Sequence, residues 1–501
     1  MKVLFGKKLK GARLNRSRFA VAYWWNMAGK LMVRGISIIS TLILVRFLSP
    51  EDFGIVAISM MFYGFFQVAT SMSVDRYLIM HPNPSEELYN SSWTLSIFMR
   101  ICAVTLLVLS SSTIAEYMGN PDLIIVLQVT ALTGLVSAFK SFGLVKFAKE
   151  VNFGPLNKIT IVAKIFATLV TLAIAIYTNS YAALLVGNFV MEVILVVLSH
   201  KVSKHKSYFC LNLESGMFSF SLTMMVRSLL SYSRSQLDTF LIAKFFGQEK
   251  VGEFNVSKTF ALLPQTEVIT PGIQPIFSLL AEKSTEPNLI MRGVFSALFI
   301  CYCIIFPSIF GFFVVANSFV DIVLGDKWSD SADILGWISI LMLPFATQPL
   351  LNSAYDLLKK EKVSLYIDII SMFCFLSVIF IFVPNTLLSF IQLRAYVGIG
   401  ALVLSIFLAV KFLKISPMYF LIVISLPLAC SAVMYLLLKM HIFQVENQFI
   451  SLVANVLSGA LIYSVLLFIS IAIIYVINRK SWLITILPQV VLNKFEALFP
   501  K

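Results

Sequence analysis

The chain has 501 residues, of which 59% are hydrophobic and only 13% are charged. Soluble proteins carry about 45–50% apolar and about 25% charged residues, so this composition excludes a soluble globular protein and indicates a polytopic membrane protein. The net charge of +14 is explained by basic connections between membrane helices and by anionic lipid headgroups, and we expect no nucleic-acid partner.

Apolar runs of about 20 residues, the length that crosses the hydrocarbon core as a helix, recur along the chain. They lie at 20–47, 54–73, 92–114, 122–145, 159–177, 181–199, 216–246, 253–277, 291–316, 331–355, 363–383, 386–410, 418–438 and 448–477. We therefore predict an all-α polytopic membrane protein with about 14 transmembrane helices.

Lysine and arginine gather in alternate connections, beginning with residues 1–19. Because short basic connections stay in the cytoplasm, both termini are predicted to be cytoplasmic. The tail at 479–501 has the pattern of an amphipathic segment that lies on the inner surface of the membrane. The first apolar run is too long for a cleaved signal peptide and is predicted to remain as the first helix.

The ends of the first and seventh predicted helices resemble each other. LVRFLSPEDFGIVAIS (44–59) and IAKFFGQEKVGEFNVS (242–257) align without gaps and pair Gly54 with Gly252. A repeat offset by six helices predicts two parallel six-helix lobes, an architecture typical of transporters. The predicted parts are a basic N-terminus (1–19), an N-lobe (20–199), a cytoplasmic linker (200–215), a C-lobe (216–412), an extra C-terminal helix pair (413–478) and the tail (479–501).

Charged residues inside the predicted helices are the main functional signal. A charge at the bilayer centre costs about 2.5–3.5 kcal/mol on insertion scales, so its side chain is expected to face a bundle interior or a hydrated cavity. Cations exceed acids, so some cations must meet water, carbonyl groups or an anionic ligand. The cations are Lys30, Arg34, Arg100, Lys164, Arg227, Arg234, Lys258 and Arg394, and the acids are Glu192, Asp238, Glu267 and Asp368.

Four of these cations form the predicted substrate site. Lys30 and Arg34 share one face of the first helix, and Arg227 and Arg234 share one face of the seventh. On the two walls of one cleft, they would bind a phosphate or pyrophosphate group. Arg234 also stands four residues before Asp238, so a local ion pair is an equally good interpretation. We favour positions near helix ends, where side chains reach the interface, for Arg46, Arg100, Lys164 and Lys244.

Three acids are candidates for ion coupling. A carboxylate in a low-dielectric cavity can load and release a proton or Na⁺ as its surroundings change, which is the role we predict for Asp238, Glu267 or Asp368. The segment LLPQTEVITPGIQPIF contains Pro264 and Pro271, which interrupt helical hydrogen bonding. This segment is predicted either to act as a hinge or to be an ordinary proline-containing membrane helix.

The sequence has no phosphate-binding loop of the G-x-x-x-x-G-K-[ST] type and no histidine or cysteine pattern typical of a metal site. No catalytic constellation stands out, and the longest predicted outer connection (316–333) is short for an external active site. We therefore expect a protein that is not an enzyme and that has no catalytic residues, cofactor or bound metal.

Several stretches resemble the Wzx-type polysaccharide transporters, which are flippases of the multidrug/oligosaccharidyl-lipid/polysaccharide exporter superfamily. They are RFLSPEDFG (46–54), FFGQEKVGEF (245–254), FSFSLTMMVRSLLSYSRSQLDTFLIAKFFG (218–247) and PGIQPIFSLLAE (271–282). Asp238 stands where these flippases usually have an acid after an Asn-Leu pair, but Gln236 and Leu237 precede it in this chain. This departure leaves the coupling role of Asp238 open.

The resemblance implies alternating access by a two-lobed bundle in a bacterial inner membrane. The implied substrate is an undecaprenyl-pyrophosphate-linked oligosaccharide that moves to the periplasmic leaflet during O-antigen, capsule or exopolysaccharide synthesis. Implied partners are H⁺ or Na⁺, membrane lipids, and the polysaccharide polymerase with its chain-length machinery. The alternatives are a cation-coupled multidrug exporter, a peptidoglycan-precursor flippase and a membrane glycan polymerase or ligase.

Overall fold

The computed structural model describes residues 16–70, 74–150, 152–203, 205, 207–212, 215–273, 287–440 and 447–477. Within these ranges the regular structure is helical and no strand occurs. The basic N-terminus before residue 16 and the predicted amphipathic tail from residue 478 onward lie outside the described residues.

The chain folds into two compact units. Unit 1 comprises Met1–Leu48 and Ile55–Lys244, and unit 2 comprises Ser49–Gly54 and Phe245–Lys501. These units are defined by packing, whereas the predicted lobes follow the sequence repeat. The predicted lobe boundaries therefore stay a prediction.

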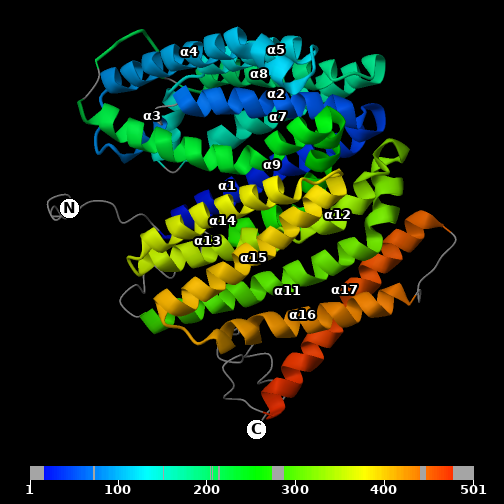
Figure 1. The fold of residues 1–501 in the computed structure, drawn as a ribbon. Helices are drawn as coiled ribbons and strands as arrows, with labels where there is room; N and C mark the ends of the chain where they lie inside the picture. Colours follow the sequence, from blue (N-terminus) through cyan, green and yellow to red (C-terminus); the bar gives the residue numbers. More distant parts are fainter. Residues whose placement is uncertain are drawn as a thin grey trace. The chain divides into compact units, whose positions relative to one another are not determined.

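Unit 1 is a bundle in which neighbouring helices pack along their lengths. α7 packs against both α1 and α8, and α5 packs against both α4 and α8, which Figure 1 shows running alongside one another. The elements are α1 (Arg16–Phe47), the part of α2 (Pro50–Thr70) from Ile55 onward, α3 (Val74–Met80), α4 (Glu86–Met118), α5 (Leu123–Ala138), α6 (Gly143–Lys149), α7 (Gly154–Thr178), α8 (Ala182–Val202) and the part of α9 (Ser215–Ala261) up to Lys244.

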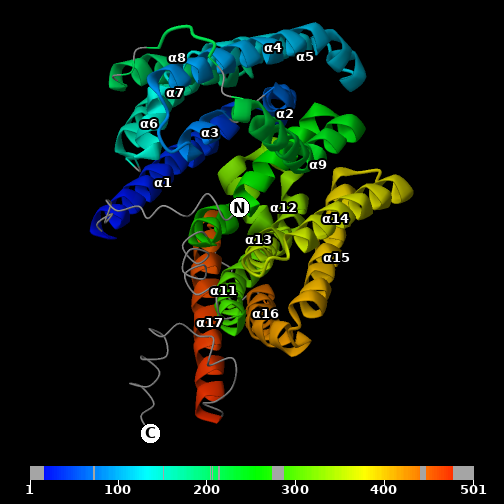
Figure 2. The same ribbon diagram turned by 90° about the vertical axis from the view of Figure 1, so that its left-hand side faces the viewer.

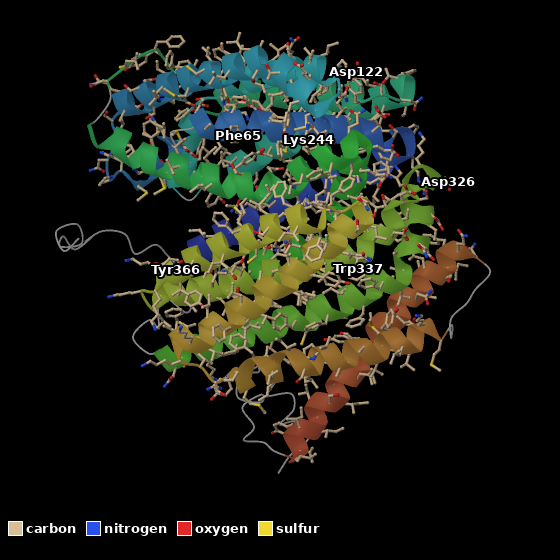
Figure 3. The ribbon with its side chains drawn as sticks, viewed as in Figure 1. Phe65, Asp122, Lys244, Asp326, Trp337 and Tyr366 are labelled. Atoms are coloured by element: carbon tan, nitrogen blue, oxygen red, sulfur yellow. The ribbon has the colours of Figure 1, made fainter. Side chains whose placement is uncertain are left out.

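Unit 2 is built around α11, which packs against α12, α13, α16 and α17. Figure 2 shows α17 beside α11. Trp337 of α12, labelled in Figure 3, packs edge-on against Phe313 and Tyr396. The elements that follow α9 are η1 (Pro264–Ile269), α11 (Pro287–Phe319), η2 (Val320–Leu324), η3 (Asp326–Trp328), α12 (Ser331–Ser339), α13 (Met342–Leu357), α14 (Glu361–Phe382), α15 (Leu387–Leu413), α16 (Pro417–Lys439) and α17 (Gln448–Ile477).

The chain is a multi-pass membrane protein. Among the described residues, 11 helices are long and apolar enough to cross a membrane, or up to 12 if α5 and α6 form one bent span. Their outward faces carry large apolar side chains, such as Leu109 (75% exposed), Ile381 (73%) and Leu461 (67%), which suit contact with hydrocarbon. The all-helical membrane fold is confirmed, and the count of about 14 helices stays a prediction.

The two glycines that the repeat pairs meet at a close crossing of α2 and α9, within unit 2. A Cβ atom added to Gly54 would lie 1.7 Å from the carbonyl oxygen of Gln248, and one added to Gly252 would lie 1.8 Å from that of Pro50. Pro50 and Gln248 are themselves partners in the alignment of the two segments. The crossing is therefore symmetric, and only glycine lets the two backbones approach this closely.

A break at Gly247 divides α9 into two helices. Gly247 has φ 82° and ψ −178°, a conformation that glycine adopts at little cost. Its partner in the repeat is Ser49, which begins α2 by donating from its hydroxyl to Asp52 Oδ2 at 2.7 Å. A new helix thus starts after Ser49 in the first repeat and after Gly247 in the second. The break at Gly247 agrees with the predicted boundary between the seventh helix (216–246) and the eighth (253–277).

The proline-containing segment after α9 also departs from regular helix. Residues Pro264–Ile269 form a π-helix rather than a continuation of α9. Pro264 cannot donate a backbone hydrogen bond, and single π turns mark interruptions of an α-helix. The predicted interruption is therefore present, while a hinge function stays a prediction.

Replacing either crossing glycine should destabilise the protein. We expect Gly54→Ala and Gly252→Ala each to cost about 1–3 kcal/mol, the usual range for overpacking, because the clash is with backbone. Thermal unfolding in detergent should show a lower midpoint for both variants. Gly400→Ala is the control, since nothing lies within 4 Å of its added Cβ. Unchanged midpoints for both crossing variants would contradict the close approach.

Candidate functional site

The close packing of α1 and α7 forms the frame of the candidate site in unit 1. Nδ2 of Asn157 donates to the carbonyl oxygen of Trp25 at 3.0 Å. A Cβ atom on Gly29 would lie 2.4 Å from the Asn157 side chain. The absence of a side chain at Gly29 therefore lets α1 and α7 approach each other. Gly29 directly precedes Lys30, the first predicted site cation.

This frame brings positive charges together on neighbouring helices. Lys30 is exposed, and Arg34 and Lys164 are half-buried. α1 packs against α7, and the Arg34 guanidinium and the Lys164 ammonium are close enough to interact electrostatically. Like charges repel, and an anionic ligand bound between them would offset that repulsion. We name Lys30, Arg34 and Lys164 the α1/α7 cation cluster.

Two of the four cations predicted near helix ends lie in the middle of spans instead. Lys164 is 10 residues after Gly154, the first residue of α7, and Arg100 is 14 residues after Glu86, the first residue of α4. At 1.5 Å per residue these positions are about 15 Å and about 21 Å along their helices. The prediction was wrong for both, because α4 and α7 begin five or more residues before their apolar runs. Arg46 does lie in the last turn of α1.

The first part of α9 belongs to unit 1 and is fastened at several points. Tyr232 donates from its hydroxyl to the carbonyl oxygen of Met61 on α2 at 2.9 Å. Near the end of this part, Lys244 donates to the carbonyl oxygen of Tyr117 on α4 at 2.7 Å and lies 3.8 Å from the centre of its ring. Figure 3 labels Lys244 in unit 1. Phe240 stacks on the same tyrosine.

The connection that leads into α9 is also fastened to α4. The backbone amides of Tyr208, Cys210 and Asn212 donate to side-chain oxygens of Asn90, Thr94 and Ser91 respectively, at 2.9–3.0 Å. The predicted cytoplasmic linker therefore includes a segment held along the first turns of α4. We name residues 207–212 the α4 strap.

The predicted residues on α9 lie in different environments. The side chain of Arg227 lies outside the described part of the structure, Arg234 is exposed and Asp238 is 5% exposed. α1 and this part of α9 both pack within unit 1, so the helices that we expected on opposite walls of a cleft belong to one compact unit. A shared anion site and an Arg234–Asp238 ion pair stay predictions.

The other two coupling candidates lie in unit 2. Glu267 is half-buried in η1, and its Oε1 accepts a hydrogen bond from the Thr266 hydroxyl at 2.9 Å. Asp368 is half-buried on α14. Asp238 belongs to unit 1. Within the described ranges, no group of three or more histidine, cysteine, aspartate or glutamate side chains is arranged to hold a metal ion.

The structure also contains polar contacts inside unit 1 that sequence reasoning missed. Lys140 pairs with Glu192 at 2.6 Å, and Arg100 donates from Nη1 to the Tyr63 hydroxyl at 3.0 Å. Lys140 and Glu192 both lie in predicted apolar runs, where an acid and a base are expected to find each other. That signal could have predicted the ion pair, whereas the tyrosine partner of Arg100 carries no sequence pattern.

The sequence profile of a family described as polysaccharide biosynthesis protein matches residues 43–333, more than half of the chain. The chain belongs to this family. It is 20% identical over 323 residues to the lipopolysaccharide biosynthesis protein WzxC of Escherichia coli (strain K12). This alignment covers 64% of this chain and 66% of WzxC. It is 23% identical over 366 residues to a membrane protein from the cps region of Klebsiella pneumoniae, covering 71% of this chain and 74% of that protein.

Solved transporters share the fold of this family member. The inward closed conformation of the lipid II flippase MurJ superposes with a TM-score of 0.72 at 14% identity, covering 91% of this chain and 98% of MurJ. An inward-facing multidrug resistance transporter of the MATE family and MOP superfamily gives a TM-score of 0.55 at 12% identity, covering 76% and 95% of the two chains. These matches show that the chain has the transporter fold that the sequence resemblance implied.

The matches confirm the resemblance to Wzx-type transporters and the transporter fold. The family and its structural neighbours are transporters and flippases rather than enzymes. The roles of the individual predicted residues, from Lys30 to Asp368, stay predictions.

Removing one charge from the α1/α7 cation cluster should stabilise the empty protein. We expect Lys164→Met to raise the free energy of unfolding by about 1 kcal/mol or more, because a charge inside the membrane costs about 2.5–3.5 kcal/mol. The same variant should lose part of the rise in melting midpoint that inorganic pyrophosphate gives the wild type. Thermal unfolding in detergent with and without pyrophosphate measures both effects.

Lys411→Met is the matched control, because Lys411 is an exposed lysine in the last turn of α15. It should change neither the midpoint nor the response to pyrophosphate. A lower midpoint for Lys164→Met would show that Lys164 stabilises the fold, and would contradict the repulsive cluster.

Proposed function

We propose that this protein is a flippase that moves an undecaprenyl-pyrophosphate-linked oligosaccharide from the cytoplasmic to the periplasmic leaflet of a bacterial inner membrane. The movement proceeds by alternating access and supplies the synthesis of a surface polysaccharide such as O-antigen, capsule or exopolysaccharide. Both termini are cytoplasmic in this proposal, and the polysaccharide polymerase and chain-length machinery receive the product.

The family membership supports the biosynthetic pathway. Relatives are named for lipopolysaccharide biosynthesis in Escherichia coli, teichuronic acid biosynthesis in Bacillus subtilis and succinoglycan transport in Rhizobium meliloti. These polysaccharides differ chemically. The proteins named for these pathways therefore share a need to move a glycan across the membrane. A lipid-linked glycan with a common anionic headgroup meets that need.

The α1/α7 cation cluster is the observation that carries the substrate class. Lys30, Arg34 and Lys164 place positive charge on two packed helices inside the membrane span. A pyrophosphate headgroup would offset the repulsion among these charges, and arginine suits it because the planar guanidinium can donate two parallel hydrogen bonds. Arg227 and Arg234 on α9 are the further cations that we assign to the headgroup.

The same cluster argues against the alternatives. A multidrug exporter that carries cationic drugs would favour an acidic site, although its fold is shared. A flippase for a peptidoglycan precursor would also need a pyrophosphate site, and it is distinguished by whether loss of the gene is lethal or only removes a surface polysaccharide. A polymerase or ligase would need an external active site, which the short connection at 316–333 does not favour.

Ion coupling is the second part of the proposal. We assign the binding of H⁺ or Na⁺ to Asp238, Glu267 or Asp368. Asp238 is the most buried of the three, at 5% exposed. A buried carboxylate changes its proton or sodium occupancy when its hydration changes, which is what alternating access does.

Translocation of a fluorescent undecaprenyl-pyrophosphate oligosaccharide into the outer leaflet of proteoliposomes tests the proposal. We expect Arg34→Ala, Arg227→Ala and Arg234→Ala each to lower the rate by about 10- to 100-fold, because a hydrogen bond to a charged group contributes about 1.5–3 kcal/mol. Imposed proton and sodium gradients identify the coupling ion. Asp238→Asn should abolish the response to that gradient.

Lys411→Ala is the control for removing a lysine outside the site, and it should transport like the wild type. Folding of every variant is checked by its melting midpoint. Wild-type rates in all three arginine variants would contradict the headgroup assignment, and no transport by the folded wild type under either gradient would contradict the flippase itself.

A further inference from the structure

A polar cavity of about 290 Å³ lies inside unit 1, apart from the α1/α7 cation cluster. Its lining comes from four places in the sequence: the end of α2, the start of α3, the middle of α4 and the junction of α5 with α6. The volume is near the lower limit of small-molecule sites, which are about 300–1,000 Å³. The polar side chains that matter below are those of Gln67, Asp75, Ser96, Arg100 and Lys140.

A broken helix forms one wall of this cavity. α5 and α6 meet at an angle of 70°, and the break is held by side chains of other helices. Trp93 donates from Nε1 to the carbonyl oxygen of Lys140 at 3.1 Å, and the backbone amide of Ser141 donates to the Ser199 hydroxyl at 3.0 Å. Non-helical backbone at membrane depth is tolerated where it lines a cavity, and transporters place such breaks at substrate sites.

Several polar groups of the cavity remain available to a ligand. Gln67 and Ser96 are half-buried, and neither side chain has a hydrogen-bond partner among the described residues. Arg100 has five N–H donors, and the hydrogen bond to Tyr63 uses one of them. The cavity therefore offers donors and acceptors together, from the two helices α2 and α4.

The charges around the cavity balance, in contrast to the α1/α7 cation cluster. Arg100 and Lys140 are cations, Asp75 is an acid in the lining, and Glu192 is the acid paired with Lys140. Two positive and two negative charges sum to zero. The cavity thus suits a neutral ligand that is rich in hydroxyl groups, since each hydroxyl both donates and accepts.

The remaining lining is mostly apolar, and the hydroxyls of its two polar residues, Thr70 and Ser137, donate to backbone carbonyl oxygens. Met99, Ala138 and Phe142 border the same space. A sugar ring presents hydroxyl groups at its edge and C–H groups on its face, so it matches a cavity with both polar and apolar walls. A lipid chain would leave the polar groups unpaired, and a pyrophosphate would meet Asp75.

We propose that this cavity binds one neutral sugar ring of the lipid-linked oligosaccharide, with Gln67, Ser96 and Arg100 as its hydrogen-bonding groups. The proposal rests on the proposed function. It assigns two parts of the substrate to two separate sites in unit 1. The α1/α7 cation cluster holds the headgroup that all such lipids share, and the cavity distinguishes glycans.

The test compares the binding of two probes to the purified protein in detergent. One probe is the lipid-linked oligosaccharide extracted from the source strain after deletion of the gene, and the other is undecaprenyl pyrophosphate without sugar. For Gln67→Ala combined with Ser96→Ala, we expect about 5- to 100-fold weaker binding of the first probe, the range for two lost hydrogen bonds. Binding of the sugar-free probe should not change.

Two controls make the comparison specific. Ser110→Ala removes another hydroxyl of α4, one that only donates to the helix backbone, and should change neither affinity. Arg34→Ala should weaken both probes. Equal weakening of both probes by the Gln67/Ser96 variant, or no change in either, would overturn the cavity assignment.

The outcomes also separate this inference from the proposed function. Sugar-dependent binding that is lost in the Gln67/Ser96 variant supports the cavity even if proteoliposomes show no translocation. Translocation by the wild type without a sugar-dependent difference in binding leaves the flippase intact and overturns the cavity alone.

Discussion

The contact between two helix backbones at Gly54 and Gly252 is the constraint on which the rest of the structure depends. The chain passes between its compact units beside this contact, after Leu48, after Gly54 and after Lys244. Ordinary side chains would force the backbones apart, since the carbonyl oxygens of Pro50 and Gln248 already occupy the space. One symmetric crossing therefore holds the start of α2 against the part of α9 that follows Gly247.

Unit 1 manages its intramembrane charge in two ways. Around the break between α5 and α6, cations meet acids or a phenol, as the Lys140–Glu192 pair and the Arg100–Tyr63 hydrogen bond show. Along α1 and α7, like charges stand together and repel. In the proposed function, the first group of charges is paired within the protein, and the second group binds the anionic headgroup of the substrate.

Much of the fold could be predicted from the sequence, because apolar length and the Gly54/Gly252 repeat are local patterns. The same patterns indicated Lys30 and Arg34 as neighbours on one helix face. Other features depend on contacts between distant segments and leave no local trace. Neither the approach of Lys164 to Arg34 nor the cavity below Arg100 could be predicted, since each requires knowing which helices pack together. The predicted starts of two helices were also too late in the sequence, because α4 and α7 each begin with polar residues that precede their apolar runs.

The α4 strap has a practical consequence for dividing this protein. Asn212 is held beside Ser91 near the start of α4, and Lys244 is held at Tyr117 near its end, so the segment between them is anchored to α4 at both ends. A fragment that ends in the strap would expose the groove at Gly64 where Tyr232 now sits. A fragment that ends after Lys244 would keep that groove filled. The predicted linker (200–215) and the end of unit 1 at Lys244 thus differ by about one helix.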